Sequence, residues 1–235
     1  MDLLTCRDTR RAFLHKSGAL LGAVTVMGPL AILGCESNEA EAGEISATED
    51  LMREHGVLRR VLLIFANLES RLREGRSFPP GVLTGAAGLI RRFIQDYHEK
   101  LEEEYVFPRF PKTGKLAALV QVLRRQHEVG RRITAFLLAQ GAAAGANAEG
   151  RDKLAEHLRT FAAMYRPHAA REDTVLFPAF QAAVSPEDFS ELGDKFEERE
   201  QTLFGKRGLK KIVAQVAGLE ETLGIEDLSQ FTPPL

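Results

Sequence analysis

The chain has 235 residues and a formal net charge of −2, and 44% of its residues are hydrophobic. This length suffices for one sizeable core, and the balanced charge argues against a nucleic-acid-binding protein. Two cysteines, Cys6 and Cys35, are too few for a disulfide framework or a zinc finger. Helix-favouring residues dominate and turn dipeptides are sparse, which predicts an all-α protein.

Residues 1–34 are predicted to be an export signal rather than part of the fold. The pair Arg10-Arg11, followed by Phe-Leu two residues later, resembles a twin-arginine export signal. Residues 17–34 contain no charged residue, as in the apolar middle of a secretory signal. The alternative is an uncleaved membrane anchor, but the run reaches spanning length only if its glycines and Pro29 are included. We therefore expect export to the cell envelope.

The end of this segment resembles a lipoprotein processing site. Residues 32–35 read Ile-Leu-Gly-Cys and look like a lipobox, although Leu33 is larger than the usual residue there. If the signal is processed at this point, Cys35 becomes a lipidated first residue that anchors the protein to the membrane. Residues 35–46 are rich in Glu, Ala and Gly with little to bury, which predicts a flexible tether.

Residues 47–183 are predicted to form an up-down four-helix bundle. Ser46-Ala47-Thr48-Glu49 has the spacing of a capping box, so the first helix should begin there. Apolar residues with helical spacing predict the other helices at about 82–107, 115–140 and 149–180.

Residues 184–235 are predicted to be a helical extension of two helices. Ser185 and Pro186 form a capped start with proline at the first helical position. Gly205 and Gly208 should end this helix, and a last helix should span about 209–223. We expect these two helices to pack on the bundle as a cover.

One stretch of the bundle region occurs twice. Residues 98–110 and 168–180 both read His-x3-Glu, then an apolar residue four positions later, then Phe-Pro-x-Phe. A lone histidine precedes each copy, at His55 and His127. The lone histidines lie 72 residues apart and the two copies 70 apart, and such nearly equal offsets indicate a duplicated helical hairpin.

The two hairpins would place four imidazoles and two carboxylates at one level of the bundle. Residues four apart share a helix face, so each His-x3-Glu directs both side chains inward. Two metal ions could each take two imidazoles, share both carboxylates and be bridged by oxide or hydroxide, leaving a sixth position open. Imidazole and carboxylate ligands with open positions favour iron or manganese. The candidate ligands are His55, His98, Glu102, His127, His168 and Glu172.

At these residues the chain resembles the hemerythrin-like (HHE cation-binding) family, over about residues 50–181. The resemblance implies an up-down four-helix bundle with a non-heme di-iron centre, and all six candidate ligands fall in the family's order. Oxygen-carrying members have a further His where this chain has Arg131, which argues against reversible oxygen carriage. They also use an Asp five residues after the last His, where Asp173 stands, although Glu172 matches the wider family better. Some relatives with one fewer His use the Glu that corresponds to Glu99, which makes it a reserve ligand.

Side chains around the site have alternative interpretations. Tyr105 and Tyr165 lie on inner faces within one turn of site residues, as core aromatics or as hydrogen-bond partners of a bridging Glu or a bound oxygen species. Glu103, one residue beyond the ligand position, is expected on the solvated face. Arg59 and Arg131 would either neutralise carboxylates or lie at a solvated rim, and we favour the rim.

We therefore expect an exported non-heme di-iron protein that binds or reacts with dioxygen, nitric oxide or peroxide. The alternatives are a di-iron peroxidase or ferroxidase, and a structural module for protein interaction. These residues do not decide between ligand binding and enzymatic turnover. No nucleic acid is expected as a partner, and the sequence identifies no protein partner.

Export should depend on both arginines of the pair. Replacing Arg10 and Arg11 together with Lys should keep the protein in the cytoplasm, because the twin-arginine route requires the pair. Cys35→Ala should release the protein from the membrane fraction, because the lipid would be attached at that residue. Cell fractionation measures both, and arrival of the paired-Lys variant in the envelope would contradict the assignment.

Overall fold

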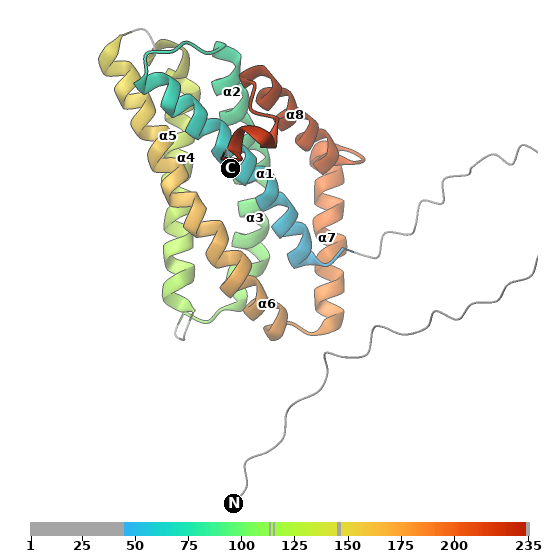
Figure 1. The fold of residues 1–235 in the computed structure, drawn as a ribbon. Helices are drawn as coiled ribbons and strands as arrows, with labels where there is room; N and C mark the ends of the chain where they lie inside the picture. Colours follow the sequence, from blue (N-terminus) through green and yellow to red (C-terminus); the bar gives the residue numbers. More distant parts are fainter. Residues whose placement is uncertain (1–44, 113, 115, 145–146, 234–235) are drawn as a thin grey trace, which may run out of the picture. The chain divides into compact units, whose positions relative to one another are not determined.

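The computed structural model describes residues 45–112, 114, 116–144 and 147–233 (Figure 1). These residues are almost entirely helical and contain no strand, which confirms the predicted all-α class. None of the described helices combines the length and the apolar character needed to cross a bilayer. The predicted export signal, Cys35 and nearly all of the tether lie outside the described residues.

Four long helical segments form the bundle (Figure 1). The segments begin with α1 (Ala47–Arg73), α2 (Pro80–Leu89), α4 (Ala117–Ala144) and α5 (Ala148–Arg171). The second segment continues through α3 (Glu99–Leu101) to Arg109, and the fourth continues through α6 (Phe177–Ala183). Helix α1 packs on α5, α5 on α4 and α4 on α2, as the short connections of an up-down bundle require.

Wider π-helical turns interrupt the second and fourth segments. Ile90–His98 is a nine-residue π-helical stretch. Shorter ones of five residues follow at Glu102–Val106 and Glu172–Leu176, at corresponding places in the sequence repeat. Such turns within α-helices are frequent at functional sites. Both five-residue turns begin at a candidate carboxylate ligand, and a Phe-Pro pair follows each of them.

The predicted helix starts are confirmed by their caps. The Ser46 hydroxyl accepts the Glu49 amide at 3.3 Å, and the Ser185 hydroxyl accepts the Asp188 amide at 3.1 Å. Each bond satisfies an amide that the first turn of a helix leaves without a backbone partner.

The C-terminal extension covers one side of the bundle. Helices α7 (Pro186–Phe204) and α8 (Gly208–Leu223) pack on each other and on α1, and α8 also packs on α2. Arg60 of α1 holds the buried Glu220 of α8 in a two-pronged ion pair. The Phe204 ring contacts Phe93 edge-on, with ring centroids 5.5 Å apart. The two additional helices therefore cover the bundle as predicted.

Helices α4 and α5 approach each other closely at Gly130. A Cβ atom added to Gly130 would lie 2.1 Å from the Tyr165 hydroxyl oxygen. Tyr165 is 1% exposed, so this contact has no free space in which to relax. The absence of a side chain at Gly130 therefore lets Tyr165 lie directly against the α4 backbone.

Two glycine-to-alanine substitutions should have opposite effects on stability. Gly130→Ala should lower the free energy of unfolding by about 1–3 kcal/mol, because the methyl group displaces Tyr165. Gly56→Ala in α1 meets no atom within 4 Å, so it should be neutral or raise that free energy by about 0.5–1 kcal/mol through helix propensity. Denaturant titrations followed by circular dichroism measure both. Equal effects would contradict the close contact at Gly130.

Candidate metal centre

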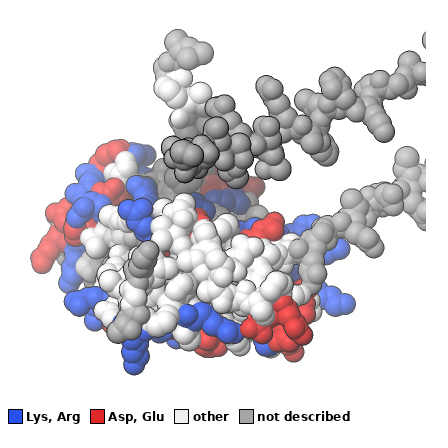
Figure 2. Space-filling model, turned by 90° about the horizontal axis from the view of Figure 1, so that it is seen from below, with Lys and Arg blue, Asp and Glu red and all other residues white. Residues whose placement is uncertain are grey.

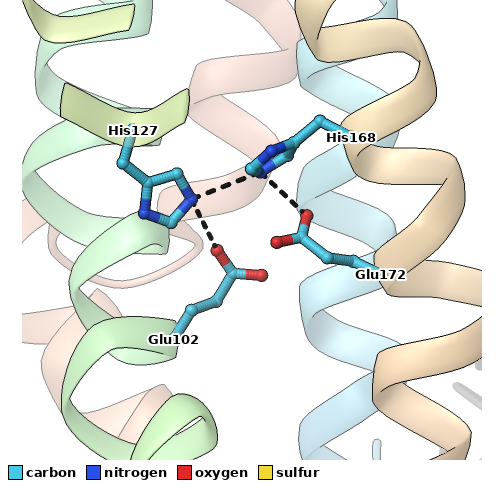
Figure 3. Close-up of side chains that lie close together, drawn as sticks. All are labelled: Glu102, His127, His168 and Glu172. Atoms are coloured by element: carbon cyan, nitrogen blue, oxygen red, sulfur yellow. Dashed lines mark hydrogen bonds and ion pairs between the residues drawn. The ribbon is translucent and has the colours of Figure 1, made fainter. Parts of the chain in front are cut away.

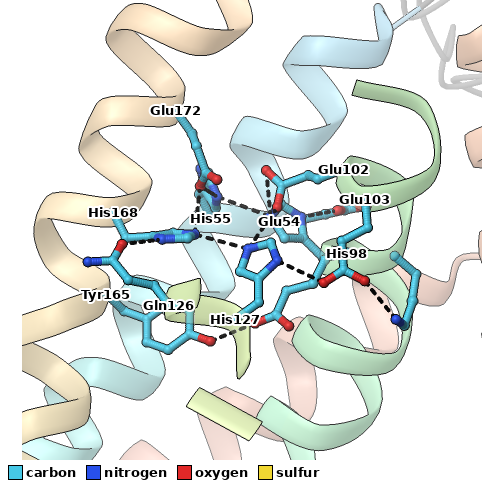
Figure 4. A network of polar contacts seen from close by, with 12 residues as sticks. Glu54, His55, His98, Glu102, Glu103, Gln126, His127, Tyr165, His168 and Glu172 are labelled. Atoms are coloured by element: carbon cyan, nitrogen blue, oxygen red, sulfur yellow. Dashed lines mark hydrogen bonds and ion pairs between the residues drawn. The ribbon is translucent and has the colours of Figure 1, made fainter. Parts of the chain in front are cut away.

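The structure brings all six predicted ligand side chains together in the bundle interior (Figures 3 and 4). Helix α1 supplies one histidine, α4 supplies another, and each His-x3-Glu copy supplies a histidine and a glutamate. Every one of the six is at most 4% exposed. They are His55, His98, Glu102, His127, His168 and Glu172.

The four imidazoles form two pairs that meet through their Nε2 atoms. The Nε2 atoms of His55 and His98 lie 3.1 Å apart. Those of His127 and His168 lie 3.2 Å apart (Figure 3). Each pair joins the lone histidine of one hairpin to the His-x3-Glu histidine of the same hairpin.

Both carboxylates reach both imidazole pairs. Glu102 has one oxygen 3.6 Å from Nε2 of His98 and the other 3.5 Å from Nε2 of His127. Glu172 Oε2 lies 3.4 Å from Nε2 of His55 and 3.1 Å from Nε2 of His168. Each carboxylate is therefore positioned to bridge ions held by the two pairs (Figure 4).

The outward-facing Nδ1 atom of each imidazole has its own hydrogen-bond acceptor. The acceptors are Asp173 for His55 (2.6 Å), Glu54 for His98 (2.6 Å), Glu103 for His127 (3.1 Å) and Gln126 for His168 (2.9 Å). A carboxylate or amide oxygen can only accept, so we assign the ring proton to Nδ1. Each Nε2 then directs a lone pair into the centre (Figure 4).

These outer acceptors follow the sequence repeat. Glu54 and Gln126 each precede a lone histidine and bind the other histidine of their own hairpin. Glu103 and Asp173 each stand five residues after a His-x3-Glu histidine and bind the lone histidine of the opposite hairpin. Outer partners of this kind fix the orientation and the tautomer of metal-binding histidines.

Arginines and phenylalanines at equivalent positions of the two repeats also make equivalent contacts. Arg59 pairs with Asp173, and Arg131 contacts Glu103 at 2.6 Å. The Phe177 ring stacks on His55 at a centroid distance of 5.6 Å, and the Phe107 ring stacks on His127 at 5.5 Å. The Phe-Pro motif therefore covers each lone histidine with an aromatic ring.

The placement of Glu103 corrects the expectation that it faces solvent. A regular α-helix would turn it away from the bundle interior, but Glu103 lies inside the π turn Glu102–Val106. The wider turn directs its carboxylate to His127. Asp173 lies in the equivalent turn, so it supports His55 from outside rather than joining the six inner side chains. An acidic residue stands five positions after the His-x3-Glu histidine in both repeats, and this shared position could have predicted the inward placement of Glu103.

Glu99, the reserve ligand, is buried on the outer side of His127. The Tyr165 hydroxyl donates to it at 2.6 Å, and an Arg131 nitrogen lies 2.8 Å from its other oxygen. One Glu99 oxygen lies within 4.8 Å of ligand atoms of Glu103 and His127, but Glu99 is not among the six inner side chains. Arg131 is partly buried and pairs with both Glu99 and Glu103, so it neutralises carboxylates, the alternative to the solvated rim that we favoured.

The two tyrosines have different positions. Tyr165 lies beside the centre, but its hydrogen bond goes to Glu99 rather than to a bridging carboxylate. Tyr105 is only half-buried, and its ring packs 5.7 Å from the Phe196 ring of α7. It therefore belongs to the contact with the C-terminal cover rather than to the centre.

The carboxylates and imidazoles at the centre have too few positive charges and hydrogen-bond donors around them among the described residues. Burial, followed by the proximity of Glu172, raises the pKa of the Glu102 carboxyl well above its usual value. Burial and then the neighbouring His55 lower the pKa of His98, which keeps its imidazole neutral. Among the described residues, none of the four oxygens of Glu102 and Glu172 meets a donor in hydrogen-bond geometry.

Buried carboxylates without partners are costly, and cations compensate them directly. Two imidazole nitrogens for each ion and two spanning carboxylates match the donor preference of iron or manganese. The residues present therefore fit a pair of metal ions.

Comparison with known proteins agrees with this geometry. The sequence model of the hemerythrin HHE cation binding domain family matches residues 46–180. The chain is 42% identical over 240 residues to uncharacterized protein Rv1995 of Mycobacterium tuberculosis and to uncharacterized protein Mb2018 of Mycobacterium bovis. The matches span 97% of this chain and 94% of each relative. No solved structure gives a significant match.

Removal of the Glu103 carboxylate should weaken metal binding. Glu103→Ala should lower the affinity about 10- to 100-fold, because His127 loses the acceptor that fixes its tautomer. The matched control is Glu104→Ala, whose carboxylate is exposed and pairs with Arg199 of α7. Competition with a chelator measures both affinities. A Glu103→Ala protein that binds as tightly as the control would contradict the supporting role.

Proposed function

Because the chain belongs to the hemerythrin HHE cation-binding family, we propose that it is a non-heme di-iron protein. It would bind or react with dioxygen, nitric oxide or peroxide. The observation that carries the proposal is the pair of carboxylates that each reach both imidazole pairs, with no donor to their oxygens among the described residues. Hydrogen bonding within the protein does not account for such an arrangement.

Each iron would take two imidazoles, and the two ions would share both carboxylates. One ion would be held by His55 and His98, and the other by His127 and His168. Four protein ligands leave room for a bridging oxide or hydroxide and for one small exogenous ligand. When bound, the iron pair supplies the one-electron chemistry that a small oxidant or nitric oxide requires.

The surroundings of the centre suit a small uncharged ligand. The rings of Phe107 and Phe177 cover the two lone histidines toward the end of the bundle where α6 begins. Figure 2 shows this end from below, with charged side chains gathered around its rim and a mostly uncharged middle. Dioxygen, nitric oxide and hydrogen peroxide carry no charge, so they can cross such a surface without an electrostatic barrier.

Arg131 favours reaction with a small ligand over reversible oxygen carriage. It stands where oxygen carriers have a fifth imidazole, and its guanidinium is held by Glu99 and Glu103. This corner of the centre would therefore contribute an ion pair instead of a further nitrogen ligand. Turnover of peroxide or of ferrous iron would make the protein a peroxidase or ferroxidase.

We also propose that the protein acts in the cell envelope, tethered by a lipid at Cys35. The support is the paired arginine, the uncharged stretch after it and the lipobox-like residues that end at Cys35.

The iron content of three variants tests the assignment of ligands. The protein should bind about two irons per chain, and Glu102→Ala and Glu172→Ala should both fall well below two, because each removes a bridge shared by both ions. Asp173→Ala should keep its iron at saturating concentration, since Asp173 contacts His55 from outside. Metal analysis and optical spectra after anaerobic iron loading and oxygen exposure measure this.

Two outcomes would count against the proposal. One zinc, or no metal, in protein from iron-replete cells would reject the di-iron assignment. Iron lost from Asp173→Ala and retained in Glu172→Ala would make His168 and Asp173 the ligands of the fourth helical segment. Reversible oxygen binding would then regain support.

A further inference from the structure

A cavity of about 590 Å³ opens between the start of α1, one face of α7 and the start of α8. Its lining includes Asp50 and Glu200, together with Arg53, Glu197 and Lys210. The cavity lies on the side of His98 that faces away from the paired metal centre, because the outer partner of His98 is Glu54, one helical turn after Asp50.

Three carboxylates converge beside this cavity. Asp50 and Glu54 come from α1, and Glu200 comes from α7. Each offers an oxygen, and the three oxygens lie within 4.8 Å of one another. Asp50 and Glu200 are partly exposed to the cavity, whereas Glu54 is fully buried. The cluster therefore has a solvent-facing side and a buried inner end.

One carboxylate oxygen of Glu54 has no hydrogen-bond partner among the described residues. Its Oε2 accepts the Nδ1 proton of His98 at 2.6 Å. Its Oε1 is buried and has no hydrogen-bond partner among the residues that the structure describes. The hydroxyl of Tyr97 donates to the Phe196 carbonyl at 3.5 Å and not to this oxygen. A buried acceptor without a donor, on a side chain that also lies beside two further carboxylates, calls for a cation.

The surrounding positive charge compensates only part of the cluster. Arg53 lies 3.6 Å from Asp50, but its side chain is 45% exposed, so water screens the pair. Glu200 Oε1 accepts the Leu209 amide at 2.9 Å near the start of α8, and its second oxygen has no hydrogen-bond donor among the residues that the structure describes. Consistent with the uncompensated charge, burial and then Glu200 raise the pKa of Asp50 to about 6.

We propose that Asp50, Glu54 and Glu200 form a third cation site, which binds one divalent metal ion at the inner end of this cavity. Its donors are carboxylate oxygens alone, so it suits a hard divalent ion such as Mn²⁺ or Fe²⁺. Without imidazole ligands it binds more weakly than the paired centre and exchanges its ion with solvent through the cavity. Glu54 joins the two sites, because the carboxylate that holds this ion also orients His98.

Counting bound Mn²⁺ by electron paramagnetic resonance tests the third site on metal-free protein. The wild type should bind about three Mn²⁺ per chain, the third more weakly than the first two. Glu200→Gln should bind one fewer, because the amide cannot supply the charge, although it still accepts the Leu209 amide. Asp50→Asn should lose the same ion. Glu197→Gln, in the same cavity but outside the cluster, should match the wild type.

The variants also separate this site from the paired centre. Glu172→Ala should lose ions from the paired centre and keep the weakly bound Mn²⁺ of the third site. The third site can therefore be counted even if the di-iron proposal fails. A wild-type count that Glu200→Gln and Asp50→Asn both leave unchanged would overturn the third site. A count that Glu197→Gln lowers as far as Glu200→Gln would also overturn it, since the loss would then reflect general cavity charge.

Discussion

Two carboxylates and four imidazole lone pairs face the same small volume inside the bundle, with Nε2-to-oxygen distances of 3.1–3.6 Å. Hydrophobic packing surrounds them, and the described residues offer the carboxylate oxygens no hydrogen-bond donor. Low-dielectric surroundings make such an arrangement unfavourable by itself and strongly attractive to cations. The π turns carry Glu102 and Glu172, and the outer acceptors hold the four imidazoles in place.

The duplicated hairpin explains how so many groups are positioned at once. Within each hairpin, the residue before the lone histidine (Glu54 or Gln126) accepts a hydrogen bond from the His-x3-Glu histidine. Between the hairpins, Glu103 and Asp173 each accept a hydrogen bond from the lone histidine of the other hairpin. The hairpins therefore support each other across the bundle, and neither forms the centre alone. The symmetry is broken at Glu99 and Tyr165, and also where Gln126 replaces the carboxylate of Glu54. These differences make the two imidazole pairs chemically unequal.

Helical periodicity and the repeat predicted the bundle, the covering helices and the meeting of the six inner side chains, because residues four apart share a face. The π turns were not predictable, since they carry no strong residue signature, and they decide where Glu103 and Tyr105 lie. The role of Glu54 depends on the packing of α1 against the second segment, which spacing along one helix does not show. The acidic cluster at Glu200 likewise depends on how α7 docks on α1.

The central claim is that the imidazole pairs and the shared carboxylates hold two irons. Anomalous diffraction at the iron edge from crystals of iron-loaded protein tests it most directly. We expect two peaks about 3.5–4 Å apart, one between His55 and His98 and the other between His127 and His168. Glu102 and Glu172 should contact both peaks. A single peak, or a peak on the Glu99 side of His127, would contradict two irons shared by the imidazole pairs.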